Sequence, residues 1–214
     1  TDSKNFLSLP KNANMLIVRQ TYKNRISQTH AKINIKTTNS IVSPELLTPI
    51  KLESQLNQSL AFVSGTASTF LKWVHEFKDN HRNQLPLGDQ AFFQAAGGDP
   101  KICYLHGYYD FDENEFMEIT TDIPDCEYWN FQLENYWMES LDYRHYPIHI
   151  NESSASLNSD KTITINVSHL PVNLKNNLIT EGRNNGAMLL RWIGATTHPI
   201  PNVEIKKLTT LENG

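Results

Sequence analysis

The sequence predicts a mainly β fold: an antiparallel, jelly-roll-like β-sandwich with a two-helix insertion near its N-terminus. Strand-like segments recur at short intervals between residues 102 and 208, and turn residues separate them. No helical pattern lies between these segments, which favours antiparallel sheets over parallel βαβ units. Helical periodicity is confined to residues 44–80, ahead of the strands.

The N-terminal part is interpreted as two strands, at residues 15–22 and 31–38. In the second, Ile33 and Ile35 alternate with polar residues, as in a half-buried strand. We expect residues 1–90 to hold these strands and the helical pair, packed on a sandwich formed by residues 91–214. With 214 residues the chain can bury a substantial core, and we expect one compact unit.

The helical pair begins with a start signal at residues 43–45, where a serine cap precedes a proline and an acid. A first amphipathic helix, kinked or delayed at Pro49, is indicated by Leu46, Leu47, Ile50, Leu56, Leu60 and Val63. Gly65 is expected to end it. A second helix is indicated by Phe70, Leu71, Val74 and Phe77.

Six strands follow a turn at residues 97–100, where two glycines precede Asp-Pro. They are expected at residues 102–109, 116–120, 128–138, 162–169, 187–193 and 203–208. The fifth is apolar on both faces except for Arg191. A buried arginine needs a partner of opposite charge, and Glu134 and Asp142 are the nearest candidates in the sequence.

The third strand carries the most informative pattern. One face is apolar and is expected to enter the core: Trp129, Phe131, Leu133 and Trp137. The other is a polar stripe bracketed by tyrosines: Tyr128, Asn130, Gln132, Glu134 and Tyr136. Tyr104, His106 and Tyr108 share one face of the first strand and would extend this surface if the strands are neighbours. Aromatic rings with amide and carboxylate groups suit a small polar or carbohydrate-like ligand. A second packing face, with its polar groups satisfied by neighbouring strands, explains the same pattern.

The C-terminal half resembles an uncharacterised family known as domain of unknown function twelve-fourteen. The matching segments, spread over residues 95–208, are residues 97–100, 106–109, 124, 126–133, 137–144, 160–161, 186, 190–192 and 199–201. The resemblance implies a jelly-roll-like sandwich, often joined to another domain, with no established activity. This chain has Asn176-Asn177-Leu178 where such proteins tend to have Asn-Trp-Leu, so a ligand surface involving that Trp would be altered.

Two alternatives to ligand binding stay open. An enzyme, as a hydrolase or lyase, would use His106 with Asp110, Glu134 or Arg144, provided that these side chains converge. The sequence lacks a nucleophile elbow, a phosphate-binding loop and a dinucleotide fingerprint. A structural partner-binding domain would instead be marked by an exposed apolar patch.

We expect neither a metal nor a cofactor. Residues 110–114 imitate the start of a calcium loop, but Glu115 stands where that loop needs glycine. His145 and His149 would lie about 13 Å apart on a strand, too far to share one ion. Cys103 and Cys126 form no Cys-x-x-Cys pair, and their spacing does not decide whether they are bonded.

Charge and hydropathy exclude several classes of partner. The formal net charge is −4 and basic residues do not cluster, which argues against nucleic acid and anionic membranes. No apolar run approaches the roughly 20 residues that span a bilayer. A soluble protein, with a cytoplasmic location favoured, is the resulting interpretation, and the oligomeric state stays undetermined.

Overall fold

The computed structural model describes residues 5–13, 16–36, 38 and 46–210, and its contacts divide the chain into two units, Thr1–Ile41 and Val42–Gly214. In the first unit the described residues of 16–22 and 31–36 form no strand, so the two strands predicted there are wrong. The amide of Gln20 instead accepts from the backbone N of Ala31 at 2.8 Å and donates to its carbonyl at 3.3 Å. A side chain therefore satisfies backbone groups that a sheet ladder would otherwise satisfy.

The helical region of the second unit is one long helix, α1 (Pro49–Asn80), followed by a short one, α2 (Gln90–Ala95). Thr48 caps α1 by accepting from the backbone N of Lys51 at 3.3 Å, and Pro49 fits the first turn, where no donor is needed. The predicted break at Gly65 is wrong. A single helical glycine costs only about 0.5–1 kcal/mol relative to alanine. The rest of the 32-residue helix offsets this cost. The start predicted at Ser43 lies outside the described residues.

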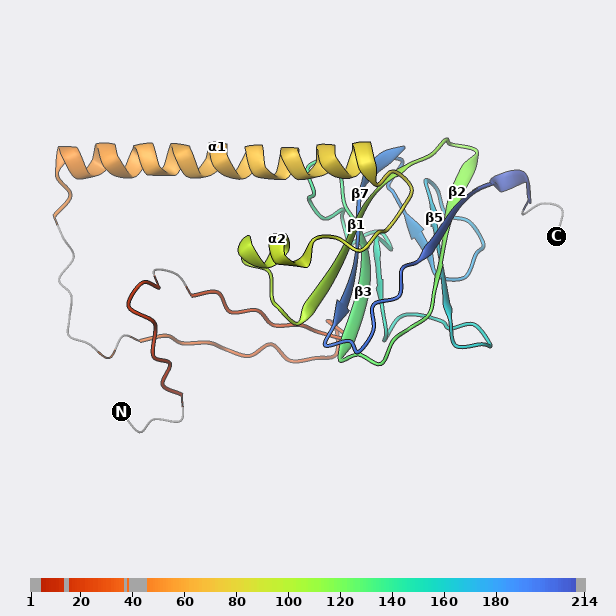
Figure 1. Ribbon diagram of the computed structural model, residues 1–214, viewed down its shortest axis with the longest axis horizontal. Coiled ribbons are helices and arrows are strands. Elements are labelled where there is room, and N and C mark those ends of the chain that lie inside the picture. The colour runs from red at the N-terminus through yellow and green to blue at the C-terminus, as the bar shows by residue number, and fades with distance from the viewer. Residues whose placement is uncertain (1–4, 14–15, 37, 39–45, 211–214) are drawn as a thin grey trace. The chain divides into compact units, whose positions relative to one another are not determined.

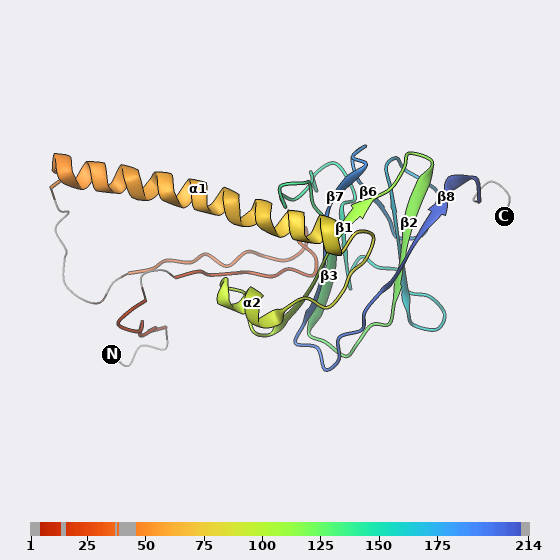
Figure 2. The same ribbon diagram turned by 45° about the horizontal axis from the view of Figure 1, so that its top comes forward.

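Two four-stranded sheets face each other in the second unit (Figures 1 and 2). The first has the order β1 (Ile102–Asp110), β7 (Asn185–Ile193), β3 (Tyr128–Leu133) and β4 (His149–Asn151). The second has the order β6 (Asn177–Ile179), β5 (Ile163–Ser168), β2 (Glu115–Thr121) and β8 (Asn202–Lys207). Every pairing is antiparallel except that of β5 with β6, and a 3-10 turn, η1 (Leu208–Thr210), follows β8. The predicted β-sandwich is confirmed.

The predicted third strand is too long, because β3 ends at Leu133. Beyond it, Asn135 Oδ1 accepts from the backbone N of Trp137 at 2.8 Å and of Glu139 at 3.0 Å, and Met138 has a φ of 59°. These bonds turn the chain and end the alternation. Trp137, predicted to lie in the core, is 56% exposed.

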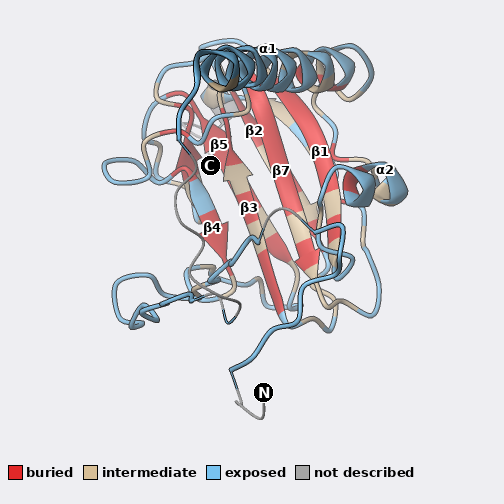
Figure 3. Ribbon diagram, turned by 90° about the vertical axis from the view of Figure 1, so that its left-hand side faces the viewer, coloured by how far each residue is buried: buried red, intermediate tan, exposed pale blue. Residues whose placement is uncertain are grey.

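The main core lies between the sheets and includes Trp129, Phe131 and Leu133, as the alternation predicts. A second cluster joins the C-terminal end of α1 to the outer face of the first sheet, where Val74 and Phe77 pack against Tyr108 and Ala187. Figure 3 shows α1 along one end of this face and α2 beside β1. The first sheet is thus covered at one end and along one edge.

Candidate ligand-binding face

The outer face of the first sheet carries two rows of side chains that cross all four strands. Strand register places Tyr104, Arg191, Asn130 and Asn151 in one row. It places His106, Leu189, Gln132 and His149 in the next. The strands β1 and β3 are not neighbours, because β7 lies between them, so the two polar strand faces share one side of the sheet without being adjacent. The central strand β7 supplies Arg191 to the face.

His106 is a buried polar group on this face. Its ring stacks on Phe77 with centroids 4.8 Å apart and an interplanar angle of 10°, and Phe93 of α2 lies 4.7 Å away. Its buried Nδ1 has no hydrogen-bond partner within the described structure. Burial, with smaller effects from the nearby charges of Arg191 and His81, lowers the pKa of His106 to about 3. The imidazole is therefore neutral at physiological pH.

Glu134 is a buried carboxyl group one position beyond β3. Gln132 Nε2 donates to its Oε1 at 3.3 Å, whereas its Oε2 has no partner among the described residues. Burial raises the pKa of Glu134 to about 7, although the positive charge of Arg191 acts in the opposite direction. The group can therefore accept or donate a hydrogen bond near neutral pH.

Arg191 is half-buried at the centre of the first row, and its Nη1 donates to Asn130 Oδ1 at 3.1 Å. Of the two carboxylates proposed as its partner, Glu134 is close enough for the positive charge of Arg191 to lower its pKa. Asp142 pairs instead with Arg144, whose Nε lies 2.9 Å away. The guanidinium therefore shares the face with an amide and a carboxyl group that is partly protonated near neutral pH.

The tyrosines of the predicted stripe take different positions. Tyr104 and Tyr136 are half-buried, and the Tyr136 hydroxyl is hydrogen-bonded to His75 Nε2 of α1. Tyr108 is fully buried and its hydroxyl donates to Asn185 Oδ1 at 2.6 Å, while Tyr128 is buried and its hydroxyl accepts from Asn151 Nδ2 at 3.1 Å. The accessible polar side chains of the two rows are thus Tyr104, Asn130, Gln132, Arg191 and the exposed His149.

The four residues considered for catalysis do not converge. Asp110 lies four residues beyond His106 on β1, a separation of about 13 Å along an extended strand, and its carboxylate is 3.5 Å from Arg82. Arg144 is exposed in the loop before β4, where it is bound to Asp142. Only His106 and Glu134 share the covered part of the face.

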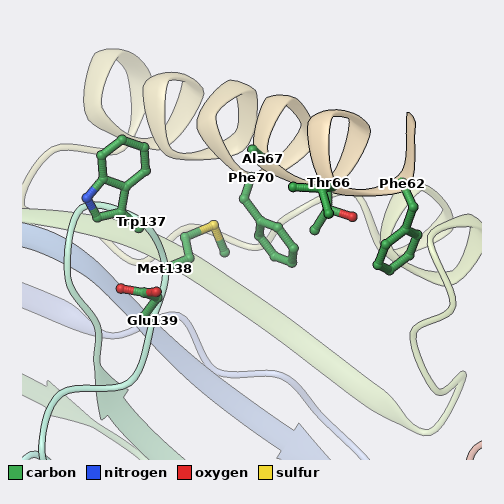
Figure 4. Close-up of a pocket in the computed structure, with 8 residues that line it drawn as sticks. Phe62, Thr66, Ala67, Phe70, Trp137, Met138 and Glu139 are labelled. Carbon is green, nitrogen blue, oxygen red and sulfur yellow. The ribbon is translucent and has the colours of Figure 1, made fainter. Parts of the chain in front are cut away.

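The structure contains a pocket of about 570 Å³, and it lies along α1 instead of beside Gln132 (Figure 4). Its walls are Phe62, Val63, Thr66, Ala67 and Phe70 on the helix and Trp137, Met138 and Glu139 on the turn after β3. The lining is mostly apolar, so this groove differs in chemistry from the polar rows.

Several residues of the face were not foreseen from the sequence. Asn151 and His149 lie on β4, whose three residues are too few to give a periodic signal. Phe77 and Phe93 cover His106 from two helices, and only Phe77 had been assigned to a helix. Across the described residues, Cys103 and Cys126 form no disulfide, and no three His, Cys, Asp or Glu side chains gather in a way that could hold a metal ion.

The fold and this face define a β-sandwich protein in which one sheet presents a half-buried polar row outward. Among its described residues no helix has both the length and the apolar character needed to cross a membrane. No family model matches the chain, and no curated protein does. The family resemblance stated above therefore stays a prediction.

Two solved structures are similar to this chain. An uncharacterised protein from Burkholderia cenocepacia matches 89% of it with 37% identity and a TM-score of 0.85, and this chain spans about half, 53%, of that protein. A protein from Vibrio parahaemolyticus matches 76% of this chain and 47% of its own length, with 13% identity and a TM-score of 0.42. The first likeness is consistent with the β-sandwich.

Proposed function

We propose that this protein is a binding domain for a small polar or carbohydrate-like ligand, held on the outer face of the first sheet. The observation that supports this most is that two buried polar atoms, Glu134 Oε2 and His106 Nδ1, have no partner among the described residues and lie beside half-buried donors. Leaving a buried polar group without a hydrogen bond costs about 1–3 kcal/mol, so a ligand that supplies the missing bond would be favoured. A ligand with hydroxyl groups would satisfy them if it displaced the side chains that cover them, such as Phe77 and Phe93 over His106.

The chemistry of the row fits such a ligand. Arg191, Asn130 and Gln132 supply donors, and Glu134 supplies an acceptor or, when protonated, a donor. The ring of Tyr104 offers a flat apolar surface for one face of a sugar ring. Neighbouring strands lie about 4.8 Å apart, so a row over four strands extends about 14 Å, which suits a ligand of one or two sugar rings.

A thermal-shift screen of neutral sugars, sugar acids and polyols tests the proposal. A ligand at a hundred times its dissociation constant stabilises the folded state by about 2.7 kcal/mol, which raises the melting temperature by several degrees. We expect Asn130→Ala and Gln132→Ala to reduce or abolish this rise, because each removes an amide from the row.

Thr164→Ala is the matched control. Thr164 is also half-buried and polar, and it points outward from β5 in the second sheet. This variant should keep the full shift seen with the wild type. If no compound of the screen stabilises the wild-type protein, or if Thr164→Ala loses the shift as fully as the row variants, the proposal is wrong.

A further inference from the structure

An apolar stripe runs along the whole of α1, and only part of it is covered. Its members recur every three or four residues: Leu52, Leu56, Leu60, Val63, Ala67, Phe70, Val74 and Phe77. Val74 and Phe77 pack on Tyr108 and Ala187, whereas the N-terminal part of the helix extends beyond the sheet (Figure 1). The C-terminal part of the stripe is therefore packed on the sheet, and its N-terminal part is exposed to solvent.

The uncovered part is strongly apolar. Leu52, Leu56, Leu60, Val63 and Phe70 are between 39% and 69% exposed, and we call them the exposed α1 face. With about 200 Å² for a large apolar side chain, these five expose roughly 550 Å². A patch of this size is at the upper end of what a typical monomer exposes, and such patches are often interaction sites.

Charge is missing from the same stretch. The 18 residues from Ser54 to Leu71 contain no Asp, Glu, Lys or Arg. An exposed helix normally carries charges on its solvent side, whereas the cores of protein interfaces are depleted of them. Charged residues return at both ends, with Lys51 and Glu53 at one and Lys72 and Glu76 at the other.

We propose that a second copy of this chain covers the exposed α1 face with its own α1, the two helices running antiparallel. Covering it on both copies would bury on the order of 1,100 Å², which exceeds the roughly 1,000 Å² that a specific interface needs. Each end of the uncharged stretch carries one lysine and one glutamate, so neither end of the helix has a net charge that opposes the pairing. The two sandwiches then lie at opposite ends of the helix pair.

The side chains suit this pairing. Antiparallel helices centred between Ala61 and Phe62 bring Leu60 opposite Val63 of the second copy and Leu56 opposite its Ala67. In both of these pairs a larger residue faces a smaller one, as interdigitating helices require. The apolar groove formed by α1 with Trp137 and Met138 lies along the same face and accepts side chains from the partner (Figure 4).

The test is the mass of the 214-residue chain in solution, by sedimentation equilibrium over a concentration series. The wild type should have twice the monomer mass of 24.5 kDa. Leu60→Glu should raise the dimer dissociation constant by about a hundredfold or more, because each dimer would bury two unpaired carboxylates. Far-UV circular dichroism checks that the variant keeps its helix.

Gln58→Glu adds the same charge on the opposite side of α1 and should leave the dimer intact. Orientation is tested by mixing Leu56→Cys and Ala67→Cys proteins, which should form a disulfide with each other, while Leu56→Cys alone should not. A monomeric wild type at every concentration, or a dimer that Leu60→Glu leaves unchanged, would show that a different partner or no partner covers this face.

Discussion

Replacing Gly107 by alanine is expected to destabilise the protein by about 3 kcal/mol or more. A Cβ at this position of β1 would lie 1.9 Å from the backbone carbonyl oxygen of Gln84 and 2.9 Å from the Met188 methyl group. The segment after α1 runs along the edge of β1 at this point, where Asn83 N donates to the carbonyl of Tyr108 at 2.7 Å. It then places Leu85 in the main core. The carbonyl cannot move away without pulling this segment from the sandwich.

Gly65→Ala is the matched control and is expected to change stability in the opposite direction. The Cβ site of Gly65 has no atom within 4 Å among the described residues, and the position is interior to α1. Alanine should therefore stabilise the protein by about 0.5–1 kcal/mol. Denaturant unfolding gives both values. Equal stabilities for the two variants would contradict the close approach of Gln84 to β1.

Opposite pH slopes are expected for variants of His106 and Glu134. The folded pKa of His106, about 3, lies below its ordinary value of 6.5, so between these pH values the unfolded state binds more protons and stability rises with pH. The folded pKa of Glu134, about 7, lies above its ordinary 4.5, so the folded state binds more protons there and stability falls as pH rises. Each slope is about 1.4 kcal/mol per pH unit, and they cancel between about pH 4.5 and 6.5.

Removing one group should expose the slope of the other. For Glu134→Gln, which keeps the hydrogen-bonding shape, we expect the free energy of unfolding to rise by about 1.4 kcal/mol per pH unit across that window, relative to wild type. For His106→Phe, the new ring can still stack between Phe77 and Phe93. We expect its free energy of unfolding to fall by about 1.4 kcal/mol per pH unit across the same window, relative to wild type.

Urea unfolding at several pH values measures these slopes, and comparison with wild type removes the contributions of all other groups. Glu113→Gln, at an exposed glutamate of the turn before β2, should reproduce the wild-type profile. Parallel profiles for all four proteins would mean that neither His106 nor Glu134 is buried in the folded state.

The strands could be predicted where an apolar pattern was long enough. Phe131 and Leu190 lie in strands whose periodicity or apolar content marks them clearly, and both are in the main core. The strands β4 and β6 have three residues each and carry no periodic signal. Trp137 was misplaced because the side chain of Asn135 turns the backbone there, and this competing hydrogen bonding is invisible to a periodicity argument.

The single helix α1 is a similar case. Gly65 and Pro49 suggested interruptions, but a glycine that meets no neighbour and a proline in the first turn cost little. The apolar stripe of α1 was visible in the sequence. The exposure of its N-terminal part was not, because exposure depends on how far the sheet reaches.

The sequence by itself determined the sandwich and which side of β3 faces the core, because both depend on local period-two alternation. Only the tertiary structure decided that Arg191 lies between Tyr104 and Asn130, and that Phe77 and Phe93 enclose His106. Strand order and helix docking join residues far apart in the chain, and that pairing depends on the free energy of the whole core.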